Sequence, residues 1–232
     1  MRNGTPADTE IGGEIEAVGL EVGDGTLTLA NLTVSGPPFL DAPFVATLRG
    51  LRSHLVLLDV TVIAPQVVRS EGAVTTRGIA TQNGSLDLVR TTVESRSVDL
   101  QEGLGRVDGA AIDTQDTAVR VVDAILAGPA VSTDGGDGST GALRVRGGRL
   151  NLYETTLGPA DAFVDQPPRT SGRLQAIGAT LDGAVAVLDG NTVDGLRSEV
   201  FATATDFRAV AGGIRIEGGR AQLVDNTVNR LT

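Results

Sequence analysis

The 232-residue sequence predicts an all-β solenoid, and three of its features predict this fold class. Residues 84–93, 148–157 and 219–228 read GSLDLVRTTV, GRLNLYETTL and GRAQLVDNTV, and weaker copies fill the intervals between them. Apolar and polar residues alternate within each copy, which is typical of short β-strands with one buried face. Glycines, 31 in all, separate the copies and favour tight turns.

The copies align into apolar columns. Their first apolar residues are 28 to 36 positions apart, at Leu27, Leu55, Leu86, Val119, Leu150, Ala186 and Ala221. The positions two after, seven after and seven before this anchor are also apolar in every copy. Such columns indicate that each strand stacks on its copy in the next coil, about 4.8 Å away. Because parallel β crossovers are right-handed, we expect a right-handed parallel β-helix of about seven coils. A fifth, weaker column predicts a third sheet, at Phe39, Val67, Val98, Val131 and Ala162.

The repeats predict one domain. We expect a single β-helix over residues 1–232, in which residues 1–24 form an N-terminal partial coil or cap. The last copy ends at Val228 and no segment that would cover it follows. We therefore expect a fragment of a longer chain, or a C-terminal coil that packs on a further domain or on another copy in a homo-oligomer.

Composition excludes several classes of function. A net charge of -10 and a pI near 4.6 disfavour binding to nucleic acid or to anionic membranes. No apolar run is long enough for membrane insertion. The absence of cysteine excludes disulfides and thiolate metal sites, and the lone His54 cannot supply a histidine-rich metal cluster. Aromatic residues make up only 3% of the chain, which disfavours a sugar-processing enzyme.

Polar columns also recur. Asn191 and Asn226 occupy one column in adjacent coils and are expected to form a short asparagine ladder. Stepping from coil to coil predicts three surface pairs of opposite charge: Asp87 with Arg120, Asp113 with Arg144, and Arg146 with Asp182.

The NTV-type strand after a glycine turn resembles the repeats of the pectate-lyase-like superfamily of right-handed parallel β-helices. In character it is nearest to bacterial surface and autotransporter-type segments, and the resemblance covers nearly the whole chain. It implies a secreted or cell-surface bacterial protein. The superfamily includes lyases, hydrolases and adhesins, so the fold implies little about activity. The acidic calcium ligands and the Gly-His-Gly segment of its enzymes are not matched here.

We expect a structural or binding segment that presents its corner loops to a glycan or protein partner. These loops cover roughly residues 40–47, 69–76, 100–109, 132–140, 165–175 and 201–211. One alternative is a polysaccharide lyase or glycoside hydrolase. Another is a tailspike-like trimeric adhesin.

Four residues are candidate ligand contacts. Asp134 and Asp137 lie in a glycine-rich segment and could bind Ca²⁺ as a cofactor, or could belong to a solvated turn. Two carboxylates fall short of the six to eight oxygens that Ca²⁺ takes. Phe201 and Phe207 could form an exposed apolar contact or fill the end of the core.

Other polar residues have a functional and a structural interpretation. Asp113 and Asp116 could be paired carboxylates for glycoside hydrolysis, but the column alignment favours a surface ladder contact for Asp113. His54 is expected to point outward as a solvated imidazole. Five arginines could form a stripe for an acidic polysaccharide or balance neighbouring charges: Arg144, Arg146, Arg149, Arg215 and Arg220.

Overall fold

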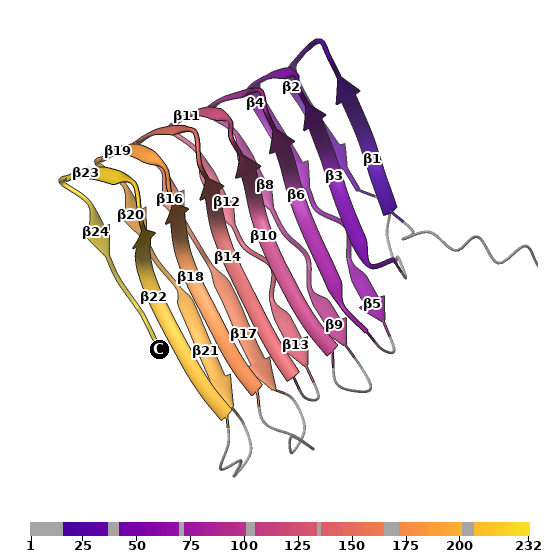
Figure 1. Ribbon diagram of the computed structural model, residues 1–232, viewed down its shortest axis with the longest axis vertical. Helices are drawn as coiled ribbons and strands as arrows, with labels where there is room; N and C mark the ends of the chain where they lie inside the picture. Colours follow the sequence, from indigo (N-terminus) through magenta and orange to yellow (C-terminus); the bar gives the residue numbers. More distant parts are fainter. Residues whose placement is uncertain are drawn as a thin grey trace, which may run out of the picture.

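The computed structural model describes residues 16–36, 42–69, 72–100, 105–133, 136–164, 172–200 and 207–232. In these residues the chain is all-β and winds into a parallel β-solenoid with three sheets (Figure 1). All pairs of neighbouring strands are parallel, as the recurrence of equivalent residues once per coil predicts. The predicted fold class is therefore confirmed.

Sheet A, which has the longest strands, forms one side of the solenoid. Its seven strands lie in chain order. They are β1 (Glu16–Gly23), β3 (Phe44–Leu51), β6 (Val74–Gln82), β10 (Gly105–Gln115), β14 (Gly136–Arg146), β18 (Gly172–Asp182) and β22 (Phe207–Glu217).

Sheet B bends around the next side of the solenoid. Two long strands, β2 (Thr26–Ser35) and β4 (His54–Ile63), run through both of its limbs. In later coils a corner divides this path. The first limb holds β7 (Ser85–Val89), β11 (Ala118–Val122), β15 (Arg149–Tyr153), β19 (Val185–Asp189) and β23 (Arg220–Val224). The second limb holds β8 (Thr92–Glu94), β12 (Ile125–Ala127), β16 (Thr156–Leu157), β20 (Thr192–Val193) and β24 (Thr227–Val228).

Sheet C closes the third side with five strands. They are β5 (Val67–Arg69), β9 (Val98–Leu100), β13 (Val131–Thr133), β17 (Ala160–Val164) and β21 (Leu196–Val200). Five coils, starting at β3, β6, β10, β14 and β18, thus have strands in all three sheets. The structure has about five complete turns rather than the seven coils predicted, because the first and last repeats have described strands only in sheets A and B.

The corners contain one or two residues with positive φ. Asn, Asp and Gly tolerate this conformation best, and they occupy most of the corner positions. Arg52 (φ 49°) and Arg90 (φ 48°) are two of the four exceptions among the described residues. Each forms an ion pair with the corner residue of the preceding coil, Arg52 with Asp24 and Arg90 with Asp59, both at 2.6 Å. The strained corners are therefore tied together along the solenoid axis.

The core is aliphatic, as the composition predicts. The predicted columns are in register, so that Leu55, Leu86, Val119, Leu150 and Ala186 stack in consecutive coils and are each at most 3% exposed. One cluster of buried Leu, Val, Ile and Ala side chains extends through the coils. This continuous core makes the outer face of sheet A a firm support for functional side chains.

Candidate functional site

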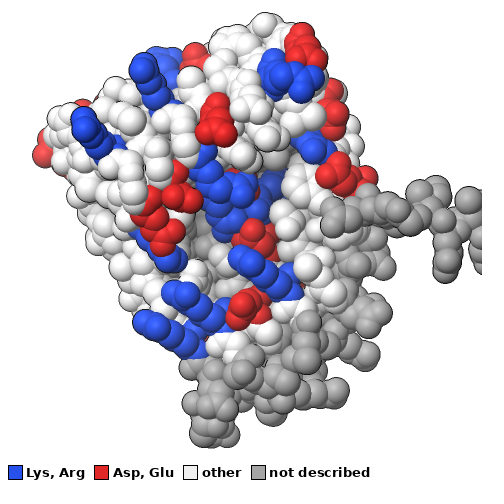
Figure 2. All heavy atoms as spheres, viewed as in Figure 1, with Lys and Arg blue, Asp and Glu red and all other residues white. Residues whose placement is uncertain are grey.

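A groove runs along the outer face of sheet A. One hollow, of about 300 Å³, lies over β10, β14, β18 and β22, and a second, of about 280 Å³, lies over β3, β6, β10 and β14. The two share Asp108 and Arg146 in their walls, so we treat them as one sheet A groove. Figure 2 shows this face, where arginine and acidic side chains gather around a hollowed centre.

Small residues form the floor of the groove. Ala110 and Gly141 face each other in register in the middle of β10 and β14, and both line the larger hollow. A Cβ atom at Gly141 would lie 2.5 Å from the carbonyl oxygen of Ile177, so the sheet accepts no side chain there without a backbone shift. The floor at this rung therefore carries no side chain larger than a methyl group.

Arg77 interrupts the floor. It occupies the same column as Ala46 and Ala110, yet it is only 3% exposed. Its Nε donates to Asp113 Oδ2 at 2.7 Å and its Nη2 to Asp108 Oδ2 at 2.9 Å. Its Nη1 donates to the carbonyl oxygens of Thr76, at 2.8 Å, and Asp108, at 2.6 Å. Two carboxylates and two carbonyls therefore satisfy this buried guanidinium.

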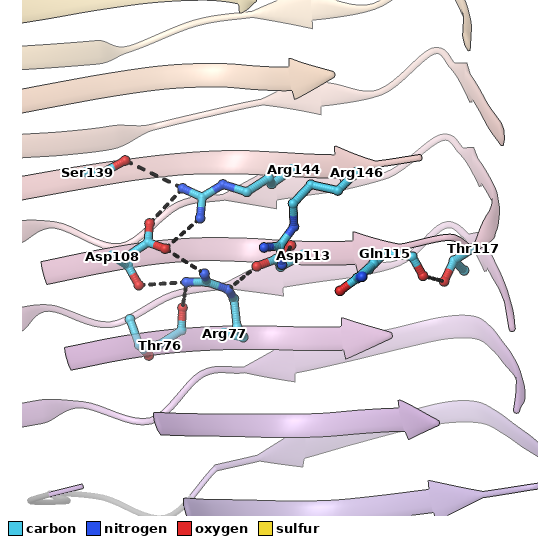
Figure 3. A network of polar contacts seen from close by, with 9 residues as sticks. All are labelled: Thr76, Arg77, Asp108, Asp113, Gln115, Thr117, Ser139, Arg144 and Arg146. Atoms are coloured by element: carbon cyan, nitrogen blue, oxygen red, sulfur yellow. Dashed lines mark hydrogen bonds and ion pairs between the residues drawn. The ribbon is translucent and has the colours of Figure 1, made fainter. Parts of the chain in front are cut away.

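Two further arginines reach the same carboxylates from β14 (Figure 3). Arg144 donates from Nη1 and Nη2 to the two oxygens of Asp108, each at 2.7 Å. Arg146 donates from Nη2 to Asp113 Oδ1 at 2.9 Å, and its side chain is 49% exposed. Together with Arg77 they form an arginine–aspartate network that joins β6, β10 and β14 and has a formal charge of +1. The network lies where the two hollows meet.

The network keeps Asp108 ionised. Burial by itself raises the pKa of this carboxyl, but the hydrogen bond from Arg144 and the charge of Arg77 outweigh it. The pKa of Asp108 is held well below its usual range. Burial lowers the pKa of Arg144, and the hydrogen bond and charge of Asp108 more than restore it. A carboxyl held in this way is unsuited to act as a general acid.

The depressed pKa of Asp108 predicts how its contribution to stability depends on pH. That contribution is complete above the pKa of the unfolded chain, about 3.9, and is lost as the pH falls through the lower pKa of the folded state. We expect Asp108→Asn to lower the free energy of unfolding at neutral pH. The difference in free energy between the variant and the parent chain should become progressively smaller below about pH 4. Urea unfolding of both proteins across this range measures the difference. A difference that grows as the pH falls would contradict the role of the ionised carboxylate.

The sequence predicted only some of these ion pairs correctly. The pair of Asp87 with Arg120 is confirmed, at 2.9 Å. Asp113 does face Arg144 in register, but the prediction of a surface contact between them is wrong, because Asp113 is 6% exposed and binds Arg77 and Arg146 instead.

Arg146 likewise faces Asp182 in register but forms its ion pair with Asp113. Column alignment identifies directly opposite residues, whereas long arginine side chains reach diagonally. Sequence reasoning missed the roles of Arg77 and Asp108. The one available signal was a charged residue in a column that otherwise holds Val, Ala, Gly and Ile.

The expected ligand contacts are not brought together in the described residues. Asp137 lies on β14 rather than in a loop, is exposed, and accepts a hydrogen bond from the backbone N of Arg173 at 3.0 Å. Asp134 and Phe201 lie outside the described residues, as does the side chain of Phe207, which begins β22. In the described part of the chain no group of three His, Asp or Glu residues could hold a metal ion, and calcium binding stays a prediction.

The predicted corner loops are shorter than expected. Strands of sheet A already begin at residues 44, 74, 105, 136, 172 and 207, within each predicted loop. Of the five arginines in the expected stripe, Arg144, Arg146 and Arg215 line the sheet A groove. Arg149 and Arg220 begin β15 and β23 of sheet B, beyond the corner, so the stripe is divided.

Asn191 and Asn226 lie in neighbouring coils at the corner of sheet B. The Asn191 side chain is buried, and its Nδ2 donates to Asn226 Oδ1 at 2.8 Å and to the carbonyl oxygen of Leu152 at 3.0 Å. Asn191 Oδ1 accepts from the backbone N of Thr155 at 3.0 Å. These bonds satisfy corner backbone groups that the strand ladder leaves open. His54 is exposed and its Nδ1 contacts the Ser85 hydroxyl.

Comparison with protein-family models and with curated proteins finds no match to this chain. Among the described residues, no helix has the length and apolar character needed to cross a membrane.

Proposed function

We propose that this chain is a non-catalytic binding segment of a β-helix protein, and that a linear glycan lies in the sheet A groove. The observation that carries the proposal is the groove itself, which has a floor of small residues and walls rich in hydrogen-bonding groups. It extends over six neighbouring strands, from β3 to β22. At about 4.8 Å per strand, the groove is about 24 Å long, which suits an extended ligand.

The walls can pair with sugar hydroxyls, which both donate and accept. Arg106, Arg146 and Gln175 supply donors, and Asp182 and Glu217 supply acceptors. Four arginines and three carboxylates line the larger hollow, so it is close to neutral although the whole chain has a charge of -10. This balance favours a neutral or weakly acidic glycan. Recognition would depend on polar contacts, since Phe44 is the only aromatic residue among the described residues that line the two hollows.

Two features of the arginine–aspartate network argue against a catalytic role for its own two carboxylates. Glycoside hydrolysis requires a protonated carboxylic acid beside a second carboxylate. Asp108 is kept ionised by Arg144 and Arg77, and Asp113 is engaged by Arg77 and Arg146. Both carboxylates in the network are therefore committed to arginine.

We also propose where the protein acts and which class of proteins it belongs to. The repeat pattern and the parallel β-solenoid support a place among bacterial secreted or cell-surface β-helices that resemble the pectate-lyase-like superfamily. In such a protein the segment would serve as a rigid support that displays a glycan-binding face. We assign this face to the groove instead of the corner loops, because the groove collects the buried and charged side chains.

Filling the groove tests the proposal. Thr180 lines the larger hollow and is part-exposed, so Thr180→Trp should block the ligand and weaken retention on the bound polysaccharide by at least about tenfold. The measurement is affinity electrophoresis on neutral and acidic polysaccharides, with and without Ca²⁺, with released products recorded in parallel.

Thr192→Trp is the matched control. Thr192 belongs to the same coil and is also part-exposed, but it lies in β20 of sheet B. We expect this variant to be retained like the parent chain. Equal retention of both variants would mean that the ligand does not bind in the sheet A groove. Release of products would mean that the chain is an enzyme and not only a binding segment.

A further inference from the structure

One column of exposed polar residues borders both hollows of the sheet A groove. It runs through five consecutive strands as Gln82, Gln115, Arg146, Asp182 and Glu217. Neighbouring members of such a column are about 4.8 Å apart. The first three line the smaller hollow, and the last three line the larger one. On this wall the larger hollow therefore has two carboxylates, where the smaller hollow has two neutral amides.

The carboxylates of the smaller hollow are already bound by arginine. Among the described residues that line this hollow, Asp108 and Asp113 are the two carboxylates. Arg77 and Arg146 each donate to one oxygen of Asp113. Asp108 accepts from Arg77 and Arg144. Since the arginine–aspartate network has a formal charge of +1, the smaller hollow holds a local excess of positive charge, although the whole chain has a charge of -10.

Arg49 also lines the smaller hollow, but other groups engage it. Its Nη1 lies 2.5 Å from Glu16 Oε2 and 3.7 Å from Glu21 Oε2. Its guanidinium lies over the ring of Phe44, 5.4 Å from the ring centre. Arg49 is therefore a side wall of the hollow, and the excess charge of the network must meet a ligand elsewhere.

Arg146 is the arginine of the network that can meet a ligand. Its side chain is half-exposed, whereas those of Arg77 and Arg144 are more buried. A guanidinium has five N–H groups, yet among the described residues Arg146 forms a hydrogen bond only from Nη2, to Asp113. Figure 3 shows the Gln115 side chain beside this pair, on the same face of the sheet. Charged and neutral donors thus lie next to each other in the smaller hollow.

From the bound carboxylates and the available donors we infer that the smaller hollow is an oxyanion subsite. Arg146 binds the anion, and the amides of Gln82 and Gln115 add neutral hydrogen bonds. The anion is a carboxylate, sulfate or phosphate group, each of which accepts hydrogen bonds from such donors. A free anion should bind here whether or not the chain binds a glycan. Only the further step, that this group is the acidic substituent of a glycan in the groove, rests on the proposed function.

An NMR titration of the parent chain with inorganic sulfate, inorganic phosphate or acetate tests the inference. Sodium chloride keeps the ionic strength constant, and the side-chain amide signals of Gln82 and Gln115 report binding. At least one anion should shift these signals until they saturate. Sulfate and phosphate represent ester groups and acetate represents a carboxylate, so the anion with the lowest Kd identifies the group. Absence of a saturable shift with all three anions would overturn the inference.

Arg146→Gln should weaken binding of the anion by at least about tenfold, because it removes the charged donors. Arg120→Gln is the matched control. Both arginines are half-exposed and pair at 2.9 Å with an aspartate of the preceding coil, but Arg120 lies on sheet B. The control should bind the anion like the parent chain, and circular dichroism checks the fold of both variants. Equal weakening in both variants would mean that binding follows the net charge, and unchanged binding by Arg146→Gln would exclude this site. Either result would overturn the inference.

Thr180→Trp distinguishes failure of this inference from failure of the proposed function. Thr180 lines the larger hollow and not the smaller one, so this variant should still bind the free anion while it loses the polysaccharide. Loss of the free anion would place the anion in the larger hollow and overturn the inference. Anion binding without retention on any polysaccharide would leave the oxyanion subsite standing and refute the glycan. Retention that Thr180→Trp abolishes, without anion binding, would refute the subsite alone.

Discussion

Replacing Arg77 by alanine is expected to lower the free energy of unfolding by about 3–5 kcal/mol, because it removes the most deeply buried arginine of the network and leaves the buried Asp113 only the half-exposed Arg146. The side chain of Asp113 is 6% exposed, and Arg77 is its partner from β6 at 2.7 Å. Asp108 would keep Arg144, but its backbone oxygen would lose the Nη1 donor. Equilibrium unfolding in urea measures the loss.

Arg120→Ala is the matched control for that prediction. Arg120 also pairs with an aspartate of the preceding coil, Asp87, at 2.9 Å, but its side chain is 52% exposed. An exposed pair of this kind contributes about 0–1 kcal/mol. If the two variants lost the same free energy, the burial of the arginine–aspartate network would have no part in holding the three coils together.

The second large effect is expected at a corner glycine. Gly148 has a φ of +67°, and a Cβ atom there would lie 2.3 Å from the carbonyl oxygen of Thr117 in the preceding coil. Gly148→Ala therefore adds a left-handed backbone cost of about 1–2 kcal/mol to an overpacking cost of about 1–3 kcal/mol. We expect a total loss of about 2–5 kcal/mol in the free energy of unfolding.

A variant at Gly183 separates the backbone cost from the overpacking cost. Its φ is +64°, nearly the same as that of Gly148, but a Cβ atom there would meet nothing within 4 Å. Gly183→Ala should therefore lose only the backbone part, about 1–2 kcal/mol. Thermal and urea unfolding of the two variants give the comparison. A Gly183 variant as unstable as the Gly148 variant would mean that close packing between corners is not the reason for glycine at Gly148.

The sequence was sufficient to predict the architecture because the solenoid repeats one chemical requirement in every coil. A position such as Leu57, Leu88 or Leu152 faces the same core and needs the same kind of side chain. The columns therefore carry the register of the strands as well as their existence. Asn191 and Asn226 could be placed together from the sequence for the same reason.

The candidate site could not be predicted in this way, because it consists of departures from the repeat. Arg77 has no counterpart in its column, and its partners lie on the next coil at two positions, Asp108 and Asp113, five residues apart. Column alignment carries no information about how far a guanidinium extends along the sheet. Column alignment also could not predict the hollow in the middle of sheet A. This hollow requires large side chains on both sides of the small residues Ala110 and Gly141.

Boundaries were the other source of error. The predicted corner loops included the start of each strand of sheet A, because residues such as Asp137, Gly138 and Ser139 have the composition of a turn. The register of β14 with β10 on one side and β18 on the other keeps these residues extended. Backbone pairing to both neighbours thus outweighs local preference.

The most direct test of the groove as the ligand-binding face is a nitrogen-15 NMR titration that follows the arginine side chains. The ligand is an oligosaccharide cut from whichever polysaccharide retains the protein. All 19 basic residues are arginine, so the Nε–Hε signals report on every face of the solenoid. The account predicts shifts at Arg106, Arg146 and Arg215, which line the groove, and none at Arg52 or Arg120 outside it. Shifts confined to Arg52, Arg120 and other arginines of the corners and of sheet B would contradict it.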